Sequence, residues 1–178
     1  AGAHVLIEKP MCLSSVEADE IVAASQRFDR LVAVDHMRSF DPLTLRAKAL
    51  VSSGQLGSIV RISVGYSHDY LQRRHADPAA RWMADLPGGW VFDLMPHVLC
   101  LVDDFLPDVE VAHTTLRHND DGVITDLACV LTSPAGDAQV HMSLDVVPLK
   151  NLVEIECTRG TVRVDFRNVL LTVRRHRG

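Results

Sequence analysis

The stretch HVLIEKPMCL, residues 4–13, decides how the beginning of the chain folds. Its apolar run, residues 5–7, is continuous rather than alternating, which is typical of a parallel strand covered on both faces. Ser14 and Glu17 have the spacing of a capping box, which predicts that a helix begins here. A second apolar run follows at residues 31–34. Together these segments predict one βαβ unit, the last part of a doubly wound α/β fold.

Lys9 ends the first strand, because the residue before a proline favours extended backbone and Pro10 stops the strand. In open α/β sheets, ligands bind outside the carboxyl ends of the strands. Lys9 is therefore a positively charged donor placed where a cofactor or substrate would lie. The alternative is a solvated strand terminus followed by an ordinary turn proline, and spacing alone does not separate the two.

Composition excludes several classes of protein. The chain has 178 residues, of which 47% are hydrophobic and 23% are charged, and these values are normal for a soluble globular protein. The net charge of −5 and the lack of a basic cluster argue against nucleic acid as a partner. The most apolar window, residues 90–106, contains three aspartates and a histidine, which argues against a membrane span.

The termini and the cysteines bear on localisation. The first ten residues lack the basic region and the cleavage site of a signal peptide. Cysteines stand at positions 12, 100, 129 and 157, and we interpret them as reduced, small core residues of a cytoplasmic protein. Because a strand follows Ala1 at once, we expect this chain to be a piece of a longer protein.

The rest of the chain changes its pattern. Asp41 and Pro42 are typical of a helix start, and Gly54 of its end. Alternating apolar residues then indicate a half-buried strand from residue 60. In residues 93–105 the apolar residues recur with helical spacing, which predicts a helix with one apolar face.

From residue 109 to residue 175, alternating segments separated by turns predict a meander of antiparallel strands. The predicted fold class is therefore α+β, with the end of a βαβ domain at residues 1–40. An open, mostly antiparallel sheet with helices on one face would occupy residues 41–178.

The segment GGWVFDLMPHVLCLVDDF, residues 88–105, is a candidate site. Asp93 and His97 are four residues apart and share one face of a helix. A carboxylate beside an imidazole would raise the histidine pKa and orient the ring for acid–base work. The alternative is that Asp93 is only an N-cap, with Pro96 in the first turn.

A loop rich in rings and charges is a second candidate. Tyr66, His68, Tyr70, Arg73, Arg74, Arg81 and Trp82 could grip a sugar or a phosphate. A solvated irregular loop explains the same composition. His68 and His75 lack a third ligand at zinc spacing, so we predict no metal site.

Three segments, in this order, resemble the glucose-fructose oxidoreductase and inositol dehydrogenase (Gfo/Idh/MocA) family. GAHVLIEKPMCLSSVEADEIV is similar to its E-K-P segment, and MRSFDPLTLRAKALVSSGQLGSIVRI to its crossover helix and next strand. GGWVFDLMPH resembles its glycine-rich D-x-x-x-H segment. The resemblance implies the end of a Rossmann domain, followed by an open C-terminal sheet.

The resemblance also implies an NAD- or NADP-dependent dehydrogenase that acts on a sugar, cyclitol or similar polyol. It assigns catalysis to Lys9, Asp93 and His97, with His97 as the base, Lys9 beside the reacting hydroxyl and Asp93 orienting the site. Glu8, Lys9 and Pro10 are the predicted cofactor-binding residues. The predicted substrate-binding residues are Arg38, Tyr66, His68, Arg81 and Trp82.

The sequence departs from the family pattern in three places. Met95, followed by Pro96, replaces a frequent glycine, and Cys100 replaces a frequent aspartate. No G-x-G-x-x-G follows a strand, so the phosphate-binding half of the Rossmann domain is absent. We therefore expect most of the cofactor to be bound by a missing N-terminal half, and the 178 residues alone to be inactive.

Two other functions are compatible with the sequence. The chain could be a non-catalytic α+β dimerisation module, and the resemblance itself implies a homodimer or homotetramer formed through the C-terminal sheet. It could also be an NAD-assisted glycoside hydrolase, which would need the same Lys9 and His97.

Overall fold

The computed structural model describes residues 2–69, 82–83 and 85–176, and these form a two-stranded and a seven-stranded sheet. The elements are β1 (Val5–Ile7), α1 (Ser15–Phe28), β2 (Val32–Val34), the 3₁₀ helix η1 (Met37–Phe40), α2 (Pro42–Ser52), β3 (Ile59–Ser67), α4 (Trp90–Asp103), β4 (Glu110–His118), β5 (Ile124–Ser133), β6 (Gly136–Ser143), β7 (Asn151–Cys157), β8 (Gly160–Asp165) and β9 (Leu170–Arg175). None of the described helices is long and apolar enough to cross a membrane. Arg81, Tyr70, Arg73, Arg74 and His75 lie outside the described residues.

The βαβ unit predicted at the N-terminus is confirmed. β1 and β2 are parallel, with Ile7 opposite Val34. The Ser14 hydroxyl accepts a hydrogen bond from the Glu17 N–H at 3.2 Å, and this cap starts α1. The Glu17 carboxylate reaches the N–H of Leu13 at 2.7 Å, one residue earlier than a standard capping box predicts.

The large sheet has the order β4-β5-β6-β3-β7-β8-β9 and is mostly antiparallel, as predicted. The expectation of a simple meander was wrong, because β3 enters the sheet between β6 and β7. It pairs with β6 in parallel and with β7 antiparallel. A register shift between Ile59 and Arg61 also turns Val60 outward, where the alternating pattern had placed an inward residue.

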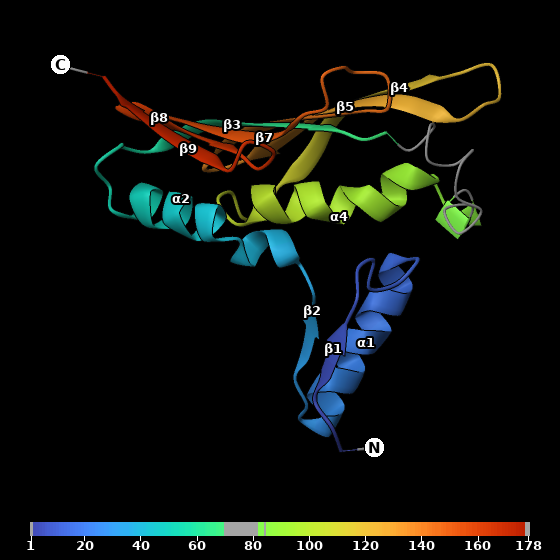
Figure 1. Ribbon diagram of the computed structural model, residues 1–178. Coiled ribbons are helices and arrows are strands. Elements are labelled where there is room, and N and C mark those ends of the chain that lie inside the picture. The colour runs from blue at the N-terminus through green and yellow to red at the C-terminus, as the bar shows by residue number, and fades with distance from the viewer. Residues whose placement is uncertain (1, 70–81, 84, 177–178) are drawn as a thin grey trace.

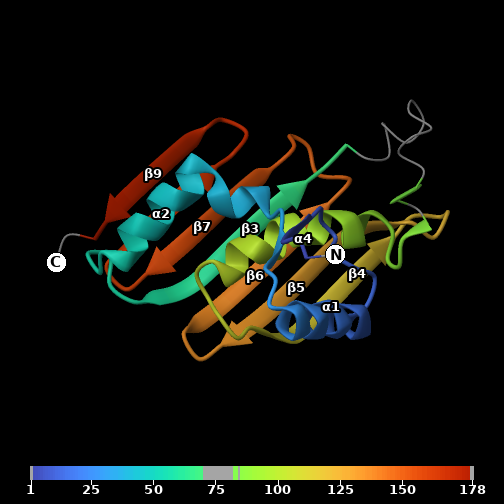
Figure 2. The same ribbon diagram turned by 90° about the horizontal axis from the view of Figure 1, so that it is seen from below.

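The core lies between one face of this sheet and the two helices α2 and α4. Both helices cover the same face (Figures 1 and 2). Buried residues of this layer are Ala47, Ile62, Val64, Leu94, Val98, Val102, Met142, Val153, Ile155, Val162 and Val164. Of the four cysteines expected in the core, Cys157 alone is fully buried, and all four are free thiols.

The N-terminal unit projects from the helix layer rather than from the sheet. In Figure 1, the blue β1-α1-β2 unit hangs below α4, with the carboxyl ends of its strands directed at that helix. No residue of α1 is buried. Lys9, just after β1, connects this unit to α4 through hydrogen bonds to Asp93.

Gly57 lets the chain turn tightly between α2 and β3. Its φ is +79°, and a Cβ built on it would lie 2.0 Å from the Thr158 hydroxyl oxygen. That hydroxyl accepts a hydrogen bond from the N–H of Ser58 at 3.2 Å, so it is held in place. Gly54 has a similar φ of +70°, but a Cβ there would meet no atom within 4 Å.

We predict that Gly57→Ala lowers the free energy of unfolding by about 2–3 kcal/mol, because a positive φ and a steric clash add together. Gly54→Ala is the matched control, with positive φ and no clash, and we expect it to cost about 1 kcal/mol. Urea unfolding monitored by circular dichroism measures both. Equal losses for the two variants would show that the contact with Thr158 is unimportant.

Candidate functional site

The carboxyl edge of the small sheet brings two cationic or titratable side chains together. β1 and β2 end in register, so Lys9 and His36 each follow two residues after the paired residues Ile7 and Val34. The helix α4 crosses beyond this edge and supplies Asp93 and His97. His36 was not predicted as a site residue, although its position just after the second strand was a usable signal.

Lys9 and Asp93 form the closest ion pair of this site. The Lys9 Nζ lies 2.7 Å from Asp93 Oδ1 and donates a second hydrogen bond to the Asp93 backbone carbonyl at 3.1 Å. The side chains are 18% and 3% exposed, respectively. A buried carboxylate requires such a partner, because an unpaired buried charge is costly. The pair therefore fixes the end of β1 against α4.

His97 lies in a positive environment, although the sequence predicted that Asp93 would raise its pKa. Burial, and then the charges of Lys9 and Arg38, lower its pKa from 6.5 to about 4, against a smaller raising effect of Asp93. Asp93 was expected to raise the pKa of the imidazole, but its carboxylate is paired with Lys9. His97 is consequently neutral at pH 7, and its buried Nδ1 has no hydrogen-bond partner within the described part of the chain.

The start of α4 explains why Asp93 is available for this pair. The helix begins at Trp90, with Gly89 as its N-cap at a φ of +61°. Asp93 is therefore not the N-cap, and Pro96 lies beyond the first turn. The alternative that Asp93 is only an N-cap is thus wrong. The buried indole of Trp90 donates to the carbonyl of Ile124, which anchors this end of α4 to β5.

Arg38 reaches the same cluster from η1. Its guanidinium lies 3.8 Å from the Asp41 carboxylate and 4.8 Å from the centre of the Phe166 ring. The stacking and the ion pair hold the planar group in one orientation. Its positive charge also contributes to the lowered pKa of His97. Arg38 is thus part of the positive surroundings of the imidazole, as well as a contact to α2 and the end of β8.

Cys100 follows His97 by one helical turn. Its Sγ lies 3.5 Å from the His97 carbonyl oxygen, and burial raises the thiol pKa. The thiol is therefore protonated at neutral pH and adds no negative charge beside the imidazole. An aspartate at this position would oppose the effect of Lys9 and Arg38.

The other predicted residues are spread more widely. Tyr66 and His68 stack with ring centroids 6.4 Å apart at the end of β3. Trp82 is 48% exposed, and Glu8 is exposed on the strand end. Arg81 lies outside the described residues. The cluster that the structure assembles is therefore Lys9, His36, Arg38, Asp93 and His97.

The composition of this cluster limits its chemistry. Among the described residues, no group of three His, Cys, Asp or Glu side chains is placed to hold a metal ion. The cluster combines a paired ammonium group with a neutral imidazole, outside the carboxyl ends of two parallel strands. A neutral imidazole is able to accept a proton, and a nearby lysine stabilises an oxygen that becomes negative.

The family model for the GFO/IDH/MocA C-terminal domain matches residues 44–163. This chain belongs to the GFO/IDH/MocA family. The family that the motifs resemble is confirmed, and so is the α+β fold class.

Two relatives and one solved structure show the extent of this similarity. A 1-carboxy-3-chloro-3,4-dihydroxycyclohexa-1,5-diene dehydrogenase of Comamonas testosteroni is 38% identical over 103 residues, which cover 57% of this chain and 25% of the relative. D-xylose 1-dehydrogenase (NADP(+)) 2 of Haloferax volcanii is 31% identical over 170 residues, covering 92% and 50%. The crystal structure of an NAD binding oxidoreductase from Klebsiella pneumoniae aligns with a TM-score of 0.82 at 21% identity, covering 98% and 51%. The chain thus spans a quarter to about a half of each of these proteins.

We predict that the His97 ring titrates near pH 4 in the folded chain, measured by NMR of its carbon-bound ring protons and assigned with His97→Gln. Lys9→Met should raise this pKa towards 6.5, because it removes a positive charge and leaves Asp93 unpaired. Lys48→Met is the matched control, since Lys48 pairs with Asp104 at 2.6 Å and should not affect the ring. A wild-type ring that titrates near 6.5 would contradict the described environment.

Proposed function

We propose that the chain is the catalytic and substrate-binding part of an NAD(P)-dependent oxidoreductase. The reaction is hydride transfer between nicotinamide and a hydroxyl-bearing carbon of a sugar, cyclitol or related polyol. The observation that carries this proposal is the meeting of the Lys9–Asp93 pair and neutral His97 outside the carboxyl edge of β1 and β2. The names of the two relatives, both dehydrogenases of hydroxylated rings or sugars, support it.

The roles follow from the protonation states. A bound nicotinamide would supply the hydride acceptor, and Glu8, Lys9 and Pro10 are the residues that would hold it here. His97, neutral at pH 7, accepts the hydroxyl proton, and the Lys9 ammonium stabilises the oxygen as negative charge develops on it. Asp93 keeps Lys9 in position through the ion pair. The low pKa of His97 makes its imidazolium a stronger acid than an ordinary one, so the same residue returns the proton in the direction of reduction.

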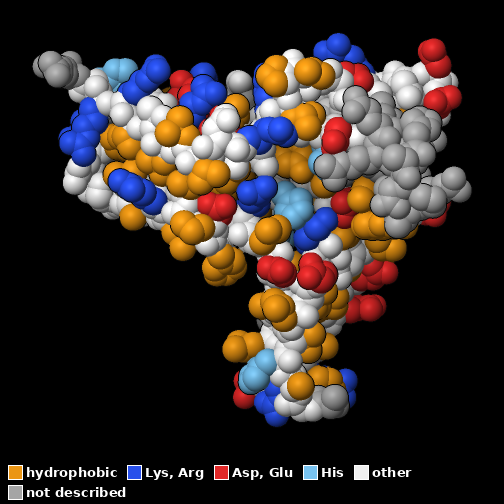
Figure 3. Space-filling view, viewed as in Figure 1, with side chains coloured by type: hydrophobic (Ala, Val, Ile, Leu, Met, Phe, Trp, Pro, Cys, Tyr) orange, Lys and Arg blue, Asp and Glu red, His pale blue; other side chains and the backbone are white. Residues whose placement is uncertain are grey.

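The fit of a dinucleotide to this chain is partial. Glu8, Lys9 and Pro10 follow a parallel strand, where the nicotinamide end of such a cofactor belongs. The N-terminal unit, however, has exposed apolar side chains that a complete doubly wound sheet would cover (Figure 3). Its exposed large apolar residues are Val5, Leu6, Leu13, Val16, Val22, Phe28 and Leu31.

We therefore assign residues 1–40 to a dinucleotide-binding Rossmann domain, and we propose that further residues of the protein complete it and bind most of the cofactor. Residues 41–178 then form the substrate-binding and oligomerisation domain. The share of each relative that the chain covers is consistent with this division.

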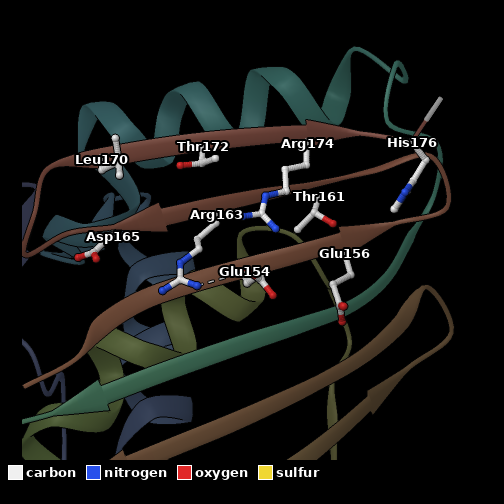
Figure 4. A pocket seen from close by; sticks show the side chains of 9 residues that line it. All are labelled: Glu154, Glu156, Thr161, Arg163, Asp165, Leu170, Thr172, Arg174 and His176. Atoms are coloured by element: carbon white, nitrogen blue, oxygen red, sulfur yellow. Dashed lines mark ion pairs between the residues drawn. The ribbon is translucent and has the colours of Figure 1, made fainter. Parts of the chain in front are cut away.

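The outer face of the large sheet is the surface that we propose for self-association into a homodimer or homotetramer. It is opposite the helices, and Figure 4 shows nine side chains of β7, β8, β9 and the end of the chain around a hollow of about 480 Å³. Acidic and basic groups alternate there, as in the Arg163–Glu154 pair at 3.8 Å. In a pair of copies these acidic and basic groups would face one another and fix the register of the two sheets.

We predict that His97→Ala, made in a longer protein that includes a complete dinucleotide-binding half, lowers kcat by about 10²–10⁴-fold, because the proton acceptor is lost. Lys9→Met should lower kcat comparably, and the 178 residues alone should show no turnover. Reduction of NAD⁺ or NADP⁺ with xylose, inositol and an alicyclic cis-diol, followed at 340 nm, measures these rates. Lys48→Met should retain wild-type turnover.

Two results would contradict this function. Unchanged turnover in His97→Ala would remove His97 as the base. Net release of sugar from a glycoside, without net reduction of the cofactor, would identify a glycoside hydrolase on the same scaffold.

A further inference from the structure

A cavity of about 580 Å³ lies beside the polar cluster, between the end of β1, the helix α4 and the β4–β5 hairpin. Its apolar wall includes Met11, Val91, Phe92, Met95, Leu99 and Leu116. The volume falls within the range of small-molecule sites, which are commonly concave and mostly apolar. The proton transfer proposed above uses none of these apolar side chains.

His36 connects this cavity to the polar cluster. It lines the cavity, and it also contributes to the electrostatic surroundings of His97. Its Nδ1 is buried and has no hydrogen-bond partner among the described residues. Pro10, next to Lys9, lies in the same wall, so the cavity begins where the polar cluster ends.

The apolar wall of the cavity determines which class of ligand it binds. A fully hydroxylated sugar would lose hydrogen bonds to water against this wall and find few replacements, which is unfavourable. A hydrocarbon ring would instead gain by leaving water. An entirely apolar occupant, such as a hydrophobic segment of protein, would offer no hydrogen bond to the imidazole of His36, which lines the cavity.

We propose that the cavity holds the hydrocarbon part of the substrate, a carbon ring that carries its hydroxyl groups along one edge. This inference rests on the proposed function, since it places the hydroxyl edge at the end of the cavity formed by Pro10 and His36, next to the polar cluster. His36 forms a hydrogen bond with the hydroxyl that does not react. The chain thereby prefers an alicyclic or ring-fused diol to a fully hydroxylated sugar or cyclitol.

The five methionines of the chain allow a direct test by NMR with ¹³C-labelled methionine methyl groups. Met11 and Met95 line the cavity, whereas Met37 is exposed and Met142 is buried in the main core. The probe is cis-indane-1,2-diol, an apolar ring system with two hydroxyls on one edge, and myo-inositol is the polar comparison. Binding needs no turnover, so an inactive protein would refute the proposed function without deciding this test.

We expect the diol to shift the Met11 and Met95 signals in a saturable manner and to leave Met37 and Met142 unchanged. Leu99→Gln should weaken binding about tenfold, because it places a polar group in the wall. Leu45→Gln is the matched control, another partly exposed helical leucine that lies outside the cavity, and should bind like the wild type.

Several outcomes would overturn the proposal. Unmoved Met11 and Met95 signals would show that the diol does not enter, and equal shifts at Met37 would show non-specific binding. Equal affinity for myo-inositol would remove the preference for an apolar ring. Shifts that depend on protein concentration rather than on the diol would identify a second copy of the chain as the occupant.

Discussion

The ion pair between Lys9 and Asp93 is the interaction on which the rest of the site depends. It joins the end of a strand to a helical residue 84 positions later in the sequence, and the carboxylate of the pair is almost fully buried. The helix α1 buries no residue, so the N-terminal unit is held from its strand ends rather than from its helix. The pair therefore sets both the geometry of the strand end and the charge around His97.

Three faces of the helix α4 contact three different parts of the molecule. One face packs Leu94 and Val98 into the main core, and a second presents Asp93 and His97 to the strand ends. A third face contributes to the wall of the apolar cavity. Anchoring by the Trp90 indole fixes the start of this helix, so the three faces keep their positions relative to one another. A change in the helix start would disturb the core, the polar cluster and the cavity together.

Much of this arrangement was readable from the sequence, because local rules determine it. The capping residue Ser14, the helix start at Asp41 and the family of the chain follow from short-range patterns, and the structure or the family comparison confirms them. The parallel pairing of β6 with β3 did not follow, because strand order depends on contacts between distant segments.

The electrostatics were less predictable for the same reason. Spacing places Asp93 and His97 on one helical face, but it does not show that Lys9 takes the carboxylate. The direction of the pKa shift of His97 was consequently wrong. His36 was missed because a single histidine after a short strand carries no motif, and the adjoining cavity is formed by segments far apart in the chain.

A double-mutant cycle of Lys9→Met and Asp93→Asn, measured by urea unfolding, tests most directly whether this ion pair holds the site together. We predict a coupling free energy on the order of 2 kcal/mol, since each single substitution leaves a largely buried polar partner unsatisfied. A coupling below about 0.3 kcal/mol, as expected for independent positions, would contradict it.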